Sequence, residues 1–314
     1  MSIPPPQQGL PPVKPSLSPH HERKNSKVPI WVWLLISAAS LCFLSLLALG
    51  FFSSYLNNGI YGEPLVRGTP QSQEAIYDRL MMEYIMAERS VAEENPESQE
   101  AQDDLKVLQR DAKVLTKLEA ADQELMNRPI GALTSSEYSD LTYRYEAVHA
   151  LDFALGYIGF DPNFDVFYGE DWGTLEMRFG ATDWTNHKAK AKLRSEIELE
   201  VARRKCEAVL WRTYEEIVAR DSDLVRLLNS AAYVKDDLRR LKRHFPELDW
   251  HGDDFKIQGN FVKEMSKNDL EIKYYVALER WQALTWVLGY GQWKEHTFDF
   301  EMRWLSEKPL KPSS

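Results

Sequence analysis

Apolar residues recur at intervals of three, four and seven along most of the chain after residue 70, which is the spacing of one helix face. The clearest stretch is 71–94, where Ile76, Leu80 and Tyr84 lie on one stripe until Asn95-Pro96 ends the pattern. The same spacing predicts further helices over 97–126, 134–158, 185–221, 222–245 and 266–289. We therefore expect an all-α or nearly all-α body.

Signals for helix ends support this division. Thr134, followed three residues later by Glu137, has the pattern of a capping box, and Ser266 is a candidate N-cap for the last long helix, which should end near Gly289. The first two predicted helices fit an antiparallel hairpin, with a coiled-coil oligomer as the alternative.

Two stretches lack the helical period. Residues 161–180 are rich in glycine and aromatic residues. This stretch predicts either a loop or a small hairpin near 165–180. Residues 246–260, which begin with a proline, predict a loop.

The run from Ile30 to Phe52 contains no charged residue. As a helix rising about 1.5 Å per residue, it is long enough to cross the roughly 30 Å hydrocarbon core of a bilayer. A cleaved signal peptide is the alternative, but the apolar region is long for a signal. We expect an uncleaved, single-pass transmembrane helix over 28–55, with residues 30–52 in contact with the lipid bilayer.

Basic residues near the two ends of this span predict its orientation. Arg23, Lys24 and Lys27 precede it, whereas Arg67 is the first Lys or Arg after it. The positive-inside rule then places the N-terminus in the cytoplasm and the body outside it, in the periplasm if the organism is bacterial. Residues 1–27 are proline-rich and lack apolar periodicity, which is typical of a disordered tail. The remaining expected parts are a linker over 56–70, a helical domain over 71–305 and a flexible tail over 306–314.

The net charge narrows the range of partners. The chain has 38 Lys+Arg and 48 Asp+Glu, a formal net charge of −10; without residues 1–52 the counts are 34 and 47, or −13. Because phosphate binding needs a positive field, we expect no nucleic-acid partner. The two cysteines, Cys42 and Cys206, predict neither a disulfide nor a zinc site, and we expect no cofactor and no metal. The sequence leaves the oligomeric state open.

Three arginines interrupt apolar helix rows. Arg144, Arg204 and Arg280 each have apolar residues three, four or seven positions away, so each should point toward packed surface. Burying an unpaired guanidinium is very costly, so each needs a carboxylate or carbonyl partner. The candidate carboxylates are Glu146, Asp152, Glu279 and Asp299.

These charges have two interpretations. One is an internal salt-bridge network that fixes how the helices pack, and the other is a pocket whose arginines hold an anionic ligand bidentately. We favour the first. Three tryptophans near these arginines along the sequence, Trp211, Trp286 and Trp293, would supply core or the wall of a recognition groove.

Searches for catalytic motifs find nothing that assigns a catalytic residue. The chain has no glycine-rich phosphate loop, no nucleophile elbow and no zinc-protease helix. His244 and His251 lie near several aspartates, but a solvated acidic loop explains that cluster better than a metal site.

Three stretches together resemble the family called domain of unknown function 4272: "LTSSEYSDLTYRYEAVHALDFALGYI", "LRSEIELEVARRKCEAVLW" and "ALERWQALTWVLGYGQWKEHTFD". The residues that carry the resemblance are Arg144, Glu146 and Ala147 in the first, Arg204 and Ala208 more loosely in the second, and Glu279, Arg280, Ala283, Leu284, Trp286, Trp293 and Asp299 in the third. Lys294 and Phe300 depart from it, where the family tends to have Asp and Thr. The resemblance covers roughly 74–300 and implies a helical fold and no established reaction.

Two functions follow from these features. We expect a membrane-anchored interaction or scaffold module that binds another membrane or envelope protein, and not an enzyme. The alternative is an enzyme or small-ligand binder that uses a buried Arg/Glu pocket for an anionic ligand.

Overall fold

The computed structural model describes residues 67–115, 118–159, 188–221, 232–291, 293 and 302–310. All of them belong to one compact unit, Asn58–Ser314. The expected tail and membrane span, the hairpin alternative near 165–180 and the candidate Asp299 lie outside the described residues. Among the residues that are described, no helix is both long and apolar enough to cross a membrane.

The described body is mainly helical, which confirms the expected fold class. Its α-helices are α2 Gln73–Glu93, α3 Gln99–Leu115, α4 Ala120–Asn127, α5 Ser135–Ala154, α8 Glu196–Asp221, α10 Ala232–His244 and α11 Lys267–Val287. Short 3-10 helices cover Val262–Glu264 (η2) and Met302–Ser306 (η3).

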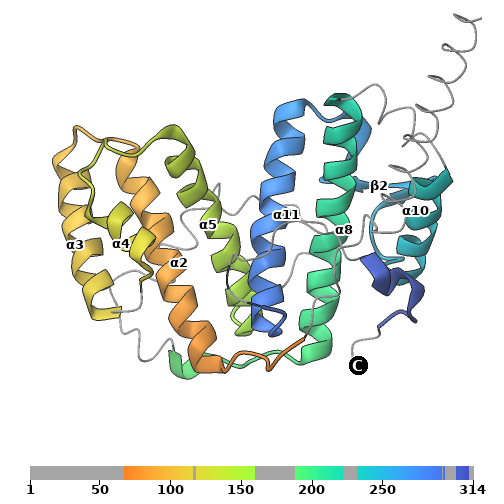
Figure 1. The fold of residues 1–314 in the computed structure, drawn as a ribbon, viewed down its shortest axis with the longest axis horizontal. Helices are drawn as coiled ribbons and strands as arrows, with labels where there is room; N and C mark the ends of the chain where they lie inside the picture. The colour runs from red at the N-terminus through yellow and green to blue at the C-terminus, as the bar shows by residue number, and fades with distance from the viewer. Residues whose placement is uncertain are drawn as a thin grey trace, which may run out of the picture. The chain divides into compact units, whose positions relative to one another are not determined.

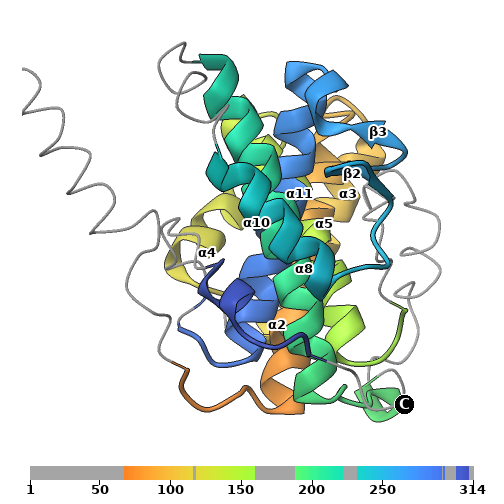
Figure 2. The ribbon, with the colours of Figure 1, turned by 90° about the vertical axis from the view of Figure 1, so that its right-hand side faces the viewer.

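Four long helices lie side by side in the order α2, α5, α11 and α8 (Figure 1). The two central helices, α5 and α11, are buried around most of their circumference in their C-terminal halves. On one side α3 packs against α2, as the expected helix hairpin requires, and α4 contacts both. On the other side α10 lies beside α8 and contacts η3 (Figure 2).

Side-chain caps define several helix starts. Thr134 and Glu137 form the expected capping box of α5, and Ser266 and Asp269 form that of α11. Two expected helices differ from the structure. The stretch 97–126 is broken between α3 and α4, and α8 begins at Glu196, not near 185, because residues 191–195 are not helical and Ser195 caps the helix.

The expected loop over 246–260 is wrong in its second half. A small antiparallel sheet runs through β1 Trp250–His251, β2 Asp254–Ile257 and β3 Asn260–Phe261. Gln258 and Gly259 both have positive φ, 53° and 73°, and form the two-residue turn that joins β2 to β3. Phe255 and Ile257 alternate inward, so the signal was an alternation only four residues long.

The helices α5 and α11 end in the same way. Their last turns read "ALDFALGY" (150–157) and "ALTWVLGY" (283–290). In each, the tyrosine N–H donates to the carbonyl five residues earlier and the glycine N–H to the carbonyl three residues earlier, which is a Schellman motif. The glycines Gly156 and Gly289 have φ of 74° and 78°.

Each of these helix ends also supports the segment that leads into one of the two outer helices of the row, α2 or α8. The N–H of Lys192, before α8, donates to the carbonyl of Leu155 at 2.8 Å, and the N–H of Gly68, before α2, donates to that of Gly289 at 2.7 Å. The end of α5 therefore holds the start of α8, and the end of α11 holds the start of α2. We call the pairs α2–α5 and α8–α11 the two halves, because each ends in the same capped turn. The end of each half supports the segment that leads into the other half.

We predict that Gly289→Ala destabilises the fold by about 3 kcal/mol or more, through left-handed strain and a steric clash. A Cβ atom at Gly289 would lie 2.4 Å from the carbonyl oxygen of Thr69. Gly252→Ala is the control, because Gly252 also has positive φ (66°) but no atom within 4 Å of its added Cβ, so only strain of about 1 kcal/mol remains. Urea denaturation of both variants measures the difference, and equal losses would contradict the role of the Gly289 contact.

Candidate functional site

The two central helices bring opposite charges together inside the body. Arg280 of α11 donates from Nε to Oε2 of Glu146 of α5 at 2.6 Å, and both side chains have no exposed surface. The α5 positions near Glu146 are apolar or buried, so the carboxylate compensates the guanidinium away from water.

Arg144 lies two residues before Glu146 on α5. It contacts α4 and α2, whereas Glu146 contacts α11. Its guanidinium forms a bidentate pair with Asp122 of α4, at 2.6 and 3.0 Å, and contacts Glu83 of α2 at 3.4 Å. Burial alone would lower the pKa of Arg144, but the carboxylates of Glu83, Asp122 and Glu279 outweigh burial and raise it. The guanidinium is therefore charged at any physiological pH.

The four charges at the α5–α11 contact thus interact reciprocally. Glu146 of α5 pairs with Arg280 of α11, while Glu279 of α11 acts electrostatically on Arg144 of α5. The sequence placed these four residues among the candidates, and the structure brings them to one helix contact.

Arg204 has different carboxylate partners. It contacts Glu200 on its own helix at 2.7 Å and Glu307 near the C-terminus at 2.8 Å, and its guanidinium lies 5.2 Å from the ring centroid of Trp304. Arg204 therefore links α8 to η3, and among the described residues it forms no ion pair with the carboxylates that hold Arg144 and Arg280.

A second charged cluster on α8 includes residues that the sequence reading missed. Arg203 contacts Glu200 at 2.8 Å and Glu207 at 3.0 Å, and Trp304 donates from Nε1 to Glu207 Oε2 at 2.9 Å. Glu207 has no exposed surface, and burial raises its pKa to about 7 although Arg203 and Trp304 act in the opposite direction. The spacing of Glu200, Arg203, Arg204 and Glu207 by three, four and seven was the signal that this face carries paired charges.

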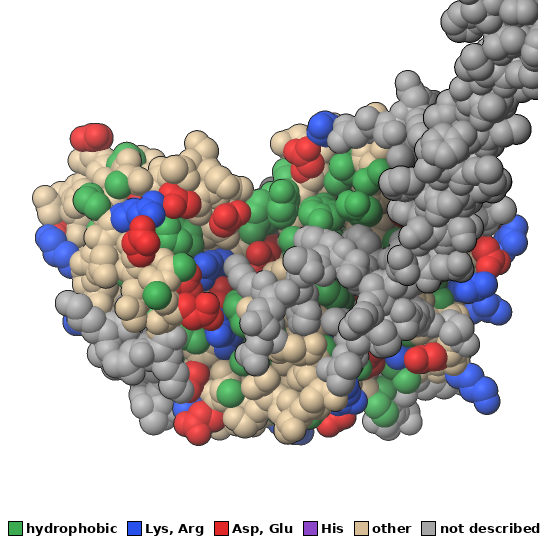
Figure 3. Space-filling view, viewed as in Figure 1, with side chains coloured by type: hydrophobic (Ala, Val, Ile, Leu, Met, Phe, Trp, Pro, Cys, Tyr) green, Lys and Arg blue, Asp and Glu red, His purple; other side chains and the backbone are tan. Residues whose placement is uncertain are grey.

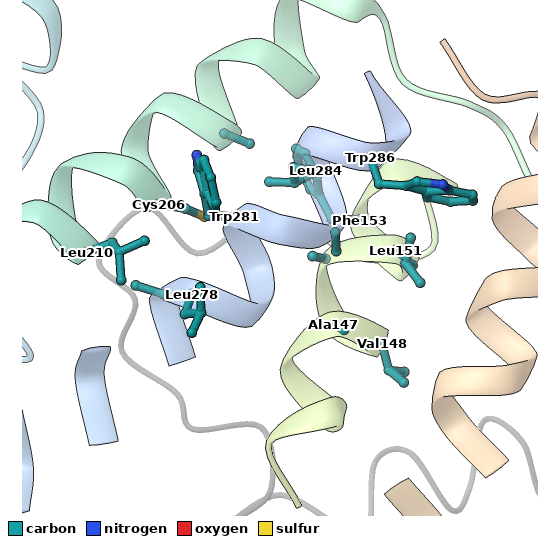
Figure 4. Packing of buried hydrophobic residues seen from close by; sticks show 14 of the residues in the cluster. Ala147, Val148, Leu151, Phe153, Cys206, Leu210, Leu278, Trp281, Leu284 and Trp286 are labelled. Atoms are coloured by element: carbon teal, nitrogen blue, oxygen red, sulfur yellow. The ribbon is translucent and has the colours of Figure 1, made fainter. Parts of the chain in front are cut away.

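The expected aromatic neighbours are buried core residues, and two of the three contact a charged group. Trp211 is buried on α8. Trp286 and Trp293 meet edge to face with ring centroids 5.3 Å apart, and the guanidinium of Arg79 lies 5.7 and 4.7 Å from their centroids. Figure 4 shows Trp281 beside Cys206 of α8 and Trp286 on the side of α11 that faces α2. These tryptophans join α11 to both outer helices.

A polar cavity of about 310 Å³ lies at the start of α11, between the β2–β3 turn and η2. Its lining consists of Gln258, Asn260, Glu264, Met265, Asp269, Ile272 and Lys273. None of the three candidate arginines is among these residues. Within the described parts of the chain, no group of His, Cys, Asp and Glu is arranged to hold a metal ion.

Comparison with known proteins finds no family model, no curated protein and no solved structure that matches this chain. The resemblance to domain of unknown function 4272 remains a prediction from the three stretches of sequence.

We predict that Arg280→Met lowers the free energy of unfolding by about 3–5 kcal/mol, because it leaves Glu146 buried without its guanidinium. The double variant Arg280→Met/Glu146→Leu should recover much of the loss, since it removes both charges. Lys106→Met is the control, because Lys106 and Asp103 form an exposed pair worth less than about 1 kcal/mol. A single-variant loss below that of the control, measured by urea denaturation, would contradict the bracing role.

We also predict that stability falls from about pH 5 to about pH 7 because of Glu207, and that this contribution levels off above pH 7. The folded chain holds a proton on Glu207 up to about pH 7, whereas the unfolded chain releases it near the ordinary glutamate value. The folded state therefore binds more protons in this window, and its stability falls as pH rises, by roughly 2–3 kcal/mol.

The measurement is urea denaturation at several pH values for wild type and Glu207→Gln, which should flatten the slope. Glu198→Gln is the matched control on the same helix, because hydrogen bonds from Ser195 lower the pKa of Glu198, which therefore titrates below this window. An unchanged slope in Glu207→Gln would refute the assignment.

Proposed function

We propose that this chain is a single-pass membrane protein whose helical body is a non-catalytic interaction or scaffold module of the cell envelope. The observation that carries the proposal is the pairing of the candidate arginines. Arg144 is held by Asp122 and Glu83, Arg204 by Glu200, and Arg280 by Glu146, and each of these carboxylates is largely or fully buried.

Such pairs stabilise helix packing and leave little for a ligand to bind. An anion that entered would meet carboxylates already in bidentate or charge-assisted contact with these arginines, and would place further negative charge beside them. This weighs against the alternative of an enzyme or small-ligand binder with a buried Arg/Glu pocket.

The surface favours a role in protein interaction over electrostatic attraction of a charged ligand, because charges of one sign do not gather on the face in view (Figure 3). Acidic and basic side chains are interspersed on the face shown in Figure 3, and apolar side chains gather over the upper parts of α11 and α8. A row of tyrosines crosses three helices: Tyr143 and Tyr275 have ring centroids 5.2 Å apart, Tyr275 and Tyr274 5.3 Å, and Tyr274 and Tyr214 6.3 Å. Tyrosines of this kind are common in recognition surfaces because they are amphipathic and lose little entropy.

The membrane part of the proposal depends on the sequence. The uncharged run from Ile30 to Phe52 is long enough to cross a bilayer, and the basic residues that precede it favour a cytoplasmic N-terminus. The body is then held outside the cytoplasm on a linker of residues 56–70.

We predict that alkaline phosphatase fused after Ser314 is active outside the cytoplasm, whereas a fluorescent protein that folds only in the cytoplasm is dark at the same position. Deletion of 30–52 is the control and should reverse both signals, because it removes the only expected span. A cytoplasmic signal from the full chain would overturn the orientation.

Partner binding is tested by crosslinking in intact cells, followed by purification of the full chain from membranes. A chain truncated after residue 66 is the control, because it keeps the expected span and lacks the body. A specific membrane or envelope protein should be recovered with the full chain alone. Recovery of the same proteins with both chains would count against an interaction module.

A further inference from the structure

The segment "KAKAKLR", Lys188–Arg194, has four basic residues in seven positions and no acidic one. This is unusual in a chain with a net charge of −10. Two of the four, Lys190 and Lys192, are exposed, and among the described residues neither has a carboxylate within 4 Å. Within the described part of the chain, the segment therefore presents positive charge that no carboxylate neutralises.

The segment lies at the end of the body from which the chain leads toward the expected membrane span. The helices α2 and α8 begin at this end and α5 and α11 finish there, as both ribbon views show (Figures 1 and 2). Arg67, the first described residue, forms an ion pair with Glu196 in the first turn of α8. The basic segment and the linker thus meet at one end of the helix row.

The body holds this segment in a fixed position. The N–H groups of Lys192 and Arg194 donate to the carbonyls of Leu155 and Ala154 at 2.8 and 3.0 Å. The side chain of Arg194 donates to the carbonyls of Phe153 and Ile158 at 2.9 and 2.7 Å. Because these bonds fix the backbone, the exposed lysines project from a rigid surface.

Apolar side chains are exposed beside the lysines. Leu193 and Ile197, four residues apart, are 37% and 43% exposed. The nearby carboxylates are engaged by other basic groups: Glu74 by Lys188, Glu196 by Arg67 and Glu198 by Arg194. The surface formed by Lys190, Lys192, Leu193 and Ile197, which we call the basic end surface, combines apolar side chains with two ammonium groups that have no carboxylate partner among the described residues.

We infer that the basic end surface docks on the anionic headgroups of the bilayer that anchors the chain. Ammonium groups attract anionic lipid, and leucine and isoleucine side chains insert at the boundary between headgroups and acyl chains. This inference rests on the proposed membrane anchor.

The short chain between the expected span and the body favours lipid over an acidic protein as the partner of the basic end surface. Residues 53–66 separate Arg67 from Phe52, the last residue expected to contact the lipid bilayer. Even fully extended, fourteen residues span no more than about 50 Å. The bilayer surface is therefore always within reach of this end of the body, at a high effective concentration.

The experiment places the full chain in nanodiscs of phosphatidylcholine alone or with anionic phosphatidylglycerol. An environment-sensitive fluorophore is attached at Ile197→Cys in a Cys42→Ser background, in which Cys206 is buried and unreactive. Nitroxide-labelled lipids should quench this fluorophore strongly in anionic nanodiscs and weakly in neutral ones. Val107→Cys is the matched control: Val107 is 44% exposed on α3, and its fluorophore should stay unquenched in both.

Substitution of both lysines, Lys190→Gln/Lys192→Gln, should lower the ratio of docked to undocked body roughly 25-fold, about fivefold for each charge. The inference would be overturned if quenching at position 197 were the same in anionic and neutral nanodiscs and unchanged by the lysine substitutions. Quenching at position 107 as strong as at position 197 would also overturn it. Photocrosslinking from the Ile197 position in cells should yield lipid adducts, and protein adducts alone would also overturn it.

Failure of the anchor gives a different result. If a carbonate wash releases the full chain from membranes, the proposed anchor is wrong. Quenching at Ile197 after anionic vesicles are added to the released chain then still decides whether the surface docks on lipid.

Discussion

The ion pair between Arg280 and Glu146 lies where α5 and α11 cross, inside a row of helices that encloses both. A purely apolar contact would tolerate several relative positions of two helices, but a shift of one turn, about 5.4 Å, would leave a buried charge without its partner. We interpret the pair as the element that fixes this register. The tryptophans of α11 then meet α2 and α8, and the remainder of the row packs against a defined centre.

The similar halves extend this constraint to the ends of the helices. Gly156 and Gly289 each end a central helix in a left-handed turn and accept an extended segment against that turn. The segment before α8 rests on α5, and the segment before α2 rests on α11. Each outer helix is therefore placed by the central helix of the other half. A register error at the α5–α11 contact would displace both outer helices.

The sequence could predict what depends on local spacing. Helix positions, the caps at Thr134 and Ser266, and the burial of Arg144, Arg204 and Arg280 all follow from residues within seven positions of each other. The partners could not be predicted in the same way, because Asp122 and Glu83 lie 22 and 61 residues before Arg144 and no local pattern links them. The similarity of the halves was missed because it rests on a stretch of eight residues. The small sheet was missed because its alternation spans only four residues, Asp254–Ile257, which is too short to distinguish from a loop.

The geometry of the row decides what docking at its basic end would achieve. Because the four long helices begin or finish at that end, a body that rests on it stands with its helices away from the bilayer. Tyr214 lies 18 residues after Glu196 on α8, so at 1.5 Å per residue docking at the basic end would hold Tyr214 about 27 Å above the bilayer. An interaction module built in this way would present Tyr214 and Tyr275, the most exposed tyrosines of the row, at a defined distance from the membrane.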